Sequence, residues 1–226
     1  MEVDILSYIP EALQLRILCC LDAKQAVQTS MLSRTWVSLW TKTPVLNFKC
    51  SSFNNLDAFN TFVNKVLCRR DHLAKLDTVK FLGLIRSTQT LKSVFDFAFS
   101  HGVKQLEVSI HNFAGSNAWP SLKVLQSWCH WIMCPFLGSG STSFKNLTVL
   151  HLTHAIIRDV EPYSGFPILE SLKLLYCNLS TNGNINKTLR VYSLRLSHLT
   201  ISWCTSINCC KLETPRLRFL IGVPRV

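Results

Sequence analysis

A pattern of leucines that recurs along most of the chain constrains its fold more than any other feature of the sequence. Each copy has apolar residues at its first, fourth and sixth positions, as in Leu147, Leu150 and Leu152. Further copies, some of them weaker or incomplete, lie at 76–81, 103–108, 122–125, 169–174, 196–201 and 217–222. Their fourth positions are about 19 to 27 residues apart, close to the period of roughly 20 to 29 residues that one class of stacked repeats shows.

Each copy predicts a short strand, because alternate side chains of a strand point to the same side. One unit cannot bury its leucines alone, whereas stacked units bury them in a continuous core. The sequence therefore predicts an α/β fold in which residues 51–226 form an irregular leucine-rich-repeat solenoid. Residues 112–143, which hold three tryptophans and a Gly/Ser run, are expected to be a loop-rich insertion. The alternative is a chance run of leucines in an ordinary α/β domain, and the number of copies argues against it.

Two amphipathic helices are expected at the start of this region. One carries its apolar side chains between Leu56 and Leu67, and the other spans 91–99. Gly102 is suited to end the second helix, because glycine readily takes the left-handed conformation found after a helix C-terminus. These two helices form the leading helical segment of residues 51–226.

The first fifty residues follow a different pattern, which predicts a separate domain, 1–50, with three short helices between residues 10 and 43. Pro10 suits the first position of the first helix. Leu13, Ile17 and Leu21 follow at a spacing of four residues, with Leu18 beside them, and this spacing makes an apolar stripe.

The second helix is predicted from its capping residues. Asp22 is expected at the N-cap, and Gln25, three residues later, completes a capping-box pattern. Ala26, Val27 and Met31 are expected to form the apolar side of this helix.

The third helix is expected to start near Ser33, a suitable cap. Trp36, Leu39 and Trp40 would then lie on one face, and Pro44 would end the helix. Three helices of this length cannot easily bury so much apolar surface among themselves. The unit is therefore expected either to pack on the following domain or to offer an apolar face to a partner.

Composition excludes several classes of protein. With 48% hydrophobic and 16% charged residues the chain can build a core. No apolar run is long enough to span a membrane, and the acidic start around Glu2 and Asp4 is unlike a secretory signal. The ten cysteines are irregularly spaced, which favours free thiols and an intracellular protein of the nucleus or cytoplasm. The net charge of +11 leaves a basic nucleic-acid-binding protein as an alternative, although the basic residues are scattered singly among leucines.

No motif for catalysis, a cofactor or a metal stands out. Cys129, His130 and Cys134 lack a second half at zinc-finger spacing. His151 and His154 would point to opposite faces of a strand. The sequence has neither a nucleophile elbow nor a phosphate-binding glycine loop. We therefore expect no enzyme activity, cofactor or metal, and a hydrolase with an unrecognised site would have no motif behind it.

The residues from Ile9 to Leu21, together with the run from Ala26 to Trp40, resemble the F-box of plant F-box/leucine-rich-repeat proteins. The resemblance continues through Leu46-Asn47-Phe48 and the later repeats, so it covers nearly the whole chain. Two positions depart mildly from the family pattern, since Ile9 stands where leucine is usual and Thr35 where a basic residue is common.

This resemblance implies a substrate-recognition adaptor of an SCF-type (Skp–cullin–F-box) ubiquitin ligase. The F-box would bind a Skp-family adaptor and through it the cullin, the repeats would bind a target protein, and other subunits would perform the ubiquitination. Nucleic acid and membranes are not expected partners. Alternatively, the chain is a truncated member that binds the adaptor without recruiting a substrate. The residues expected to include both the adaptor-binding face and the core of the F-box are Pro10, Leu13, Ile17, Leu18, Leu21, Val27, Leu32, Trp36, Leu39 and Trp40.

Overall fold

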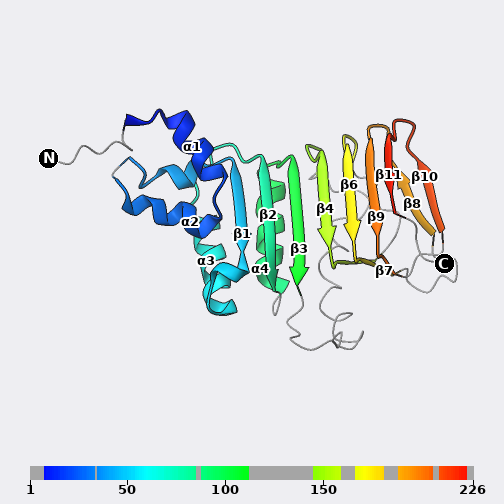
Figure 1. Cartoon of the computed structure of the whole chain (residues 1–226), viewed down its shortest axis with the longest axis horizontal. Coiled ribbons are helices and arrows are strands. Elements are labelled where there is room, and N and C mark those ends of the chain that lie inside the picture. Colours follow the sequence, from blue (N-terminus) through cyan, green and yellow to red (C-terminus); the bar gives the residue numbers. More distant parts are fainter. Residues whose placement is uncertain are drawn as a thin grey trace.

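The computed structural model describes residues 8–33, 35–84, 88–111, 145–158, 166–180, 188–205 and 209–222. They form a mixed α/β structure with a helical module at the amino-terminal end and a parallel sheet beside it (Figure 1). The strands follow the chain across the sheet, so the helical module and the carboxyl-terminal strands lie at opposite ends of the molecule.

The amino-terminal module contains two α-helices, α1 (Glu11–Cys19) and α2 (Ala23–Gln28). Pro10 lies at the N-cap of α1, one residue before the position predicted for it. The predicted capping box of α2 is confirmed. The Gln25 amide donates to the Asp22 carboxylate over 2.9 Å, and the Asp22 amide donates to the Gln25 side chain over 3.0 Å.

The third predicted helix is wrong. Short 3₁₀ helices, η2 (Thr29–Met31) and η3 (Leu39–Lys42), and the turns between them occupy this part of the chain. The Trp36 amide donates to the Ser33 carbonyl over 3.2 Å, and the Leu39 amide donates to the Trp36 carbonyl over 3.3 Å. Because side chains three residues apart eclipse in such tight winding, Trp36 and Leu39 both reach the core without an α-helix.

Both helices predicted for the leading segment are confirmed as α3 (Leu56–Arg69) and α4 (Thr88–Ser100). Asn55 caps α3 by accepting a hydrogen bond of 2.7 Å from the Ala58 amide. Gly102 follows α4 in the left-handed region, with φ +59°, and a Cβ there would lie 2.7 Å from the side chain of Asn146. The left-handed turn therefore favours glycine at this position, and any larger residue would also displace the Asn146 side chain.

Seven strands form the main sheet, and each is parallel to its neighbours. In spatial order they are β1 (Val45–Lys49), β2 (Thr78–Leu84), β3 (Gln105–His111), β4 (Val149–Thr153), β6 (Ser171–Leu175), β9 (His198–Ser202) and β11 (Phe219–Ile221). Six of them coincide with predicted leucine copies, while β1, at the edge beside the helical module, was not predicted as a strand. The copy at 122–125 and the predicted insertion at 112–143 lie outside the described residues.

The register aligns the fourth positions of the copies, so that Leu106, Leu150, Leu172 and Leu199 form a row across the sheet. All four side chains are at most 2% exposed and belong to the main core. Helices α3 and α4 contribute to the same core. Two short parallel pairs accompany the carboxyl-terminal half, namely β5 (Ile156–Arg158) with β7 (Asn178–Ser180) and β8 (Thr188–Tyr192) with β10 (Cys209–Glu213).

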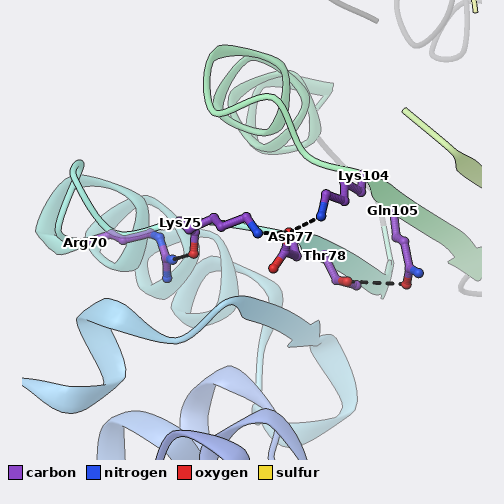
Figure 2. A network of polar contacts seen from close by, with 6 residues as sticks. All are labelled: Arg70, Lys75, Asp77, Thr78, Lys104 and Gln105. Atoms are coloured by element: carbon purple, nitrogen blue, oxygen red, sulfur yellow. Dashed lines mark hydrogen bonds and ion pairs between the residues drawn. The ribbon is translucent and has the colours of Figure 1, made fainter. Parts of the chain in front are cut away.

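A polar network joins the amino ends of β2 and β3 (Figure 2). Asp77 lies 3.3 Å from the ammonium groups of both Lys75 and Lys104. Arg70, which is only 2% exposed, donates from Nη2 to the Lys75 carbonyl over 3.2 Å. Burial lowers the pKa of Arg70 to about 10.

Asp77 makes the stability of the fold depend on pH. Burial alone would raise its pKa, but hydrogen bonds and charges from Lys104 and Lys75 outweigh burial and hold the pKa below its ordinary value. A carboxylate with a depressed folded pKa stabilises the fold above its unfolded pKa of about 3.9 and loses this contribution as the pH falls. We expect Asp77→Asn to flatten the decline in stability between about pH 5 and pH 3. Urea unfolding of both proteins across this range measures the difference, and parallel curves would contradict the assignment.

Candidate docking face of the amino-terminal module

Helix α1 divides its apolar residues between two faces. Leu18 is 1% exposed and packs in the small core of the module, and Gln14, one turn earlier, is 4% exposed. On the other side Leu13 and Ile17 remain 48% and 44% exposed. Residues four positions apart share a helix face, so the helix presents two aliphatic side chains together to solvent. Large apolar side chains gathered on an exposed face are typical of interaction surfaces.

A second group of exposed apolar side chains follows α2. Met31 is 89% exposed, Leu32 54% and Val37 53%. The prediction that Met31 belongs to the apolar side of the second helix is therefore wrong. Because α2 ends at Gln28 and the chain continues in 3₁₀ winding, Met31 is rotated off the inward face.

The structure separates the predicted F-box residues into three sets by exposure. The exposed residues are Pro10, Leu13, Ile17 and Leu32. The buried residues, which form the module's core with Ala26, are Leu18, Trp36 and Leu39. The half-buried residues are Leu21, Val27 and Trp40. Exposed apolar residues that the sequence reasoning did not select are Tyr8, Met31 and Val37. Met31 had been assigned to the apolar side of the second helix, and no helical period marks Tyr8 or Val37, so the exposure of all three became visible only with the fold.

The module is attached to the rest of the chain through α2 and β1. Ala23 belongs to the main core, and Trp40 packs against both the main core and that of the module. Lys24 Nζ donates to the Ser52 carbonyl over 2.6 Å and lies 4.8 Å from the centroid of the Phe53 ring. The Ser52 hydroxyl donates to Asp22 over 2.9 Å. These contacts hold the exposed face in a fixed place at the end of the sheet.

Asp22 therefore stabilises both the start of α2 and its attachment to the body. We expect Asp22→Ala to lower the free energy of unfolding by about 1 to 2 kcal/mol, because the N-cap bond and the bond from Ser52 are both lost. Asp22→Asn, which keeps an oxygen acceptor at the N-cap, should recover most of this loss. Chemical denaturation of the three proteins tests the prediction, and equal stability of the alanine variant and the unchanged protein would contradict it.

Within the described ranges, no three histidine, cysteine or acidic side chains lie together where they could hold a metal ion. The cysteine and histidine group at 129, 130 and 134 lies outside these ranges. No helix in the described part of the chain is both long enough and apolar enough to cross a membrane. The exposed side chains of α1 and of the segment after α2 described above are mainly apolar.

Comparisons with known proteins found both a domain match and similar full-length proteins. A family model described as the F-box domain matches residues 6–48. The chain is 28% identical to the F-box/LRR-repeat protein At5g02910 of Arabidopsis thaliana, over 77% of this chain and 39% of that protein. It is 28% identical to the F-box/LRR-repeat protein 25 of the same plant, over 85% of this chain and 76% of that protein. With the putative F-box/FBD/LRR-repeat protein At4g03220 it shares 30% identity, over 96% of this chain and 51% of that protein.

Most of these curated relatives are longer than the chain, which spans 39%, 43% and 47% of the length of three of them. No solved structure matches it. The domain match covers the helical module, and the similarity to the relatives extends over the sheet. The F-box domain match and the similarity to the Arabidopsis thaliana relatives together support a plant F-box/LRR family protein.

Proposed function

We propose that this protein is the substrate-recognition adaptor of an SCF-type ubiquitin ligase, with the F-box bound to a Skp-family adaptor and the sheet bound to a target protein. The observation that carries the proposal is the exposure of Leu13 and Ile17 beside the buried Leu18 on a helix of the F-box domain. In this account the chain binds and positions its partners, other subunits carry out ubiquitination, and the protein works in the nucleus or cytoplasm.

The energetics of such an interface favour the exposed aliphatic residues. Full burial of a leucine or isoleucine contributes about 1.5 to 3 kcal/mol. Leu13 and Ile17, each nearly half exposed in the free chain, would therefore contribute only part of this on binding. Because a few central residues usually supply most of the affinity, we place these two at the centre of the interface and Pro10, Leu32 and Met31 around them.

The sheet supports the second half of the proposal. We infer that the strands form a leucine-rich-repeat solenoid, since they follow one another across the sheet in chain order and share one buried leucine row. Their other face carries polar, half-buried side chains. There Glu107 lies 3.1 Å from Lys80 and 4.0 Å from His151. Such a mixed surface is suited to bind a protein segment.

His151 adds a pH-dependent charge to this surface. Burial lowers its pKa, and Lys173 and Lys80 lower it further, whereas Glu107 raises it. The net shift is downward, so the imidazole is neutral at pH 7 and gains its charge only in acid. Because the pKa of His151 is lower in the folded chain than in the unfolded chain, protonation destabilises the fold. The stability that the neutral imidazole contributes is lost as the pH falls through the folded pKa.

Three aromatic residues mark the carboxyl ends of β4, β6 and β9. His154, Tyr176 and Trp203 all take the left-handed conformation, with φ between +51° and +58°. Their rings stack in sequence, with 5.0 Å between the first two centroids and 6.2 Å between the next two. Left-handed backbone at non-glycine residues is uncommon and collects at functional sites. We include this aromatic ladder, of which Tyr176 and Trp203 are exposed, in the target-binding surface.

Affinity capture of the tagged chain from plant cells after proteasome inhibition, followed by mass spectrometry, tests the whole proposal. We expect a Skp-family adaptor and a cullin in the captured material together with at least one target protein that accumulates when the proteasome is blocked. The adaptor without any such target would favour the docking-only alternative. Nucleic acid without the adaptor would contradict the proposal.

A further inference from the structure

The far end of the sheet contains an arginine-lined hollow. It has a volume of about 610 Å³, and its lining residues lie at the amino ends of β6, β9 and β11, at the end of the sheet opposite to β1. Three of its residues are arginines, Arg195, Arg216 and Arg218, and all three are exposed. The other lining residues are Glu170, Ser197, Pro215 and Leu217.

The repeat geometry brings these arginines together. The Ser197 amide donates to the Glu170 carbonyl and the Arg218 amide donates to the Ser197 carbonyl, both over 2.9 Å. Residues 170, 197 and 218 therefore stand side by side just before three neighbouring strands. Arg195 and Arg216 each precede the first leucine of a copy, so they occupy the same position in adjacent repeats. A guanidinium charge therefore occurs at the same position of two adjacent repeats. Such a pair of like charges is unfavourable unless an anion lies between them.

The amino ends of the strands form one edge of the sheet, and at the opposite end of this edge lysine charges are paired with a carboxylate of the chain. At the amino ends of β2 and β3, Lys75 and Lys104 share the carboxylate of Asp77 (Figure 2). Among the described residues, no carboxylate lies within ion-pair distance of the three guanidinium groups, although Glu170 lines the same hollow. In the described part of the chain, the amino-end edge of the sheet therefore pairs its lysines with Asp77 at one end, while the three arginines at the other end have no ion-pair partner.

We propose that the arginine-lined hollow binds a phosphate group carried by the target protein, an inference that rests on the proposed function. A phosphate monoester has nearly two negative charges and three acceptor oxygens, and guanidinium groups bind such oxygens in pairs of parallel hydrogen bonds. Three arginines that line one hollow match this group better than they match a single carboxylate. A nucleic acid needs a basic track along its backbone, whereas the three arginines line a single hollow, and the same sheet carries the acidic Glu107 on β3.

Fluorescence anisotropy of the full chain with a labelled phosphoserine peptide of uncharged flanking residues tests the proposal. The probe is compared with its unphosphorylated twin and with a single-stranded oligonucleotide of similar length. We expect the phosphopeptide to bind at least about tenfold more tightly than its twin, a preference that weakens at high salt. The triple variant Arg195→Gln, Arg216→Gln, Arg218→Gln should lose this preference.

A matched control removes three exposed basic residues outside the hollow, through Lys49→Gln, Lys65→Gln and Arg69→Gln. This control loses as much positive charge as the triple variant but keeps the hollow, so it should keep the preference within about twofold. A preference that came from generic electrostatic attraction would instead fall equally in both variants. Equal binding of the two peptides, an equal loss in the control, or tighter binding of the oligonucleotide would each overturn the proposal. Binding of the Skp-family adaptor is measured on the same proteins. Adaptor binding without a preference for the phosphopeptide would refute only the phosphate site, whereas loss of adaptor binding would refute the proposed function.

Discussion

Replacing Leu13 and Ile17 together by aspartate is expected to weaken binding of a Skp-family adaptor by at least about a hundredfold, because a charge cannot be buried unpaired in an apolar interface. Both side chains are nearly half exposed in the free chain. The free energy of unfolding should therefore change by no more than about 0.5 kcal/mol, as is usual for surface substitutions. Calorimetric titration measures the affinity, and urea denaturation measures the stability.

Two control variants separate this effect from others. Leu73 is 97% exposed and lies between α3 and β2, outside the F-box. Leu73→Asp replaces an exposed leucine by aspartate at this unrelated place and should leave adaptor binding unchanged. Trp36 is 2% exposed in the module's core, and Trp36→Ala should weaken binding by destabilising the module itself. Loss of binding in Leu73→Asp, or full binding by the double aspartate variant, would refute the proposed face.

Phe59→Ala is expected to be the most damaging single change to stability. Its side chain is fully buried, and its ring centroid lies 5.5 Å from that of Phe53 and 5.6 Å from that of Phe81. It therefore joins helix α3 to the first strands of the sheet. We expect a loss of about 3 to 5 kcal/mol, which combines lost burial with the cost of the cavity left behind. Phe59→Leu, which fills part of the cavity, should lose less. Urea denaturation measures both, and a loss below about 1 kcal/mol would show that this core is not closely packed.

The sheet was largely predictable from sequence, because its determinant is local. Alternating apolar residues at a fixed spacing require a strand with one buried face, and Leu106, Leu150, Leu172 and Leu199 lie in the predicted row. The capping box of Asp22 and Gln25 was also predicted and confirmed, whereas Ser33, the cap expected for the third helix, starts no α-helix. In both cases the information lies within a few residues and does not depend on the remainder of the fold.

The docking face was only half predictable. The sequence selected Leu13, Ile17 and Leu18 as one apolar group, since hydrophobicity alone does not distinguish a core residue from a contact residue. Their separation depends on which side of α1 meets Trp36 and Leu39, a tertiary contact that no local pattern encodes. The prediction of a third α-helix was wrong for a related reason, since 3₁₀ winding also places side chains three residues apart on one face.

The arginine-lined hollow was not predicted, although the net charge of +11 had drawn attention to basic residues. Arg195 and Arg216 look scattered when read along the chain, because 21 positions separate them. They become neighbours only when the repeats stack. Aligning the copies and comparing residues at the same repeat position would have shown this pair before the fold was available.

Hydrogen–deuterium exchange of the full chain, with and without a purified Skp-family adaptor, tests whether the adaptor binds the amino-terminal module. We expect slower exchange in α1 and in residues 29–42 when the adaptor is present, with no change in β9 and β11, because the adaptor covers the face that holds Leu13 and Ile17. Protection confined to the sheet, or exchange that the adaptor leaves unchanged throughout the chain, would contradict it.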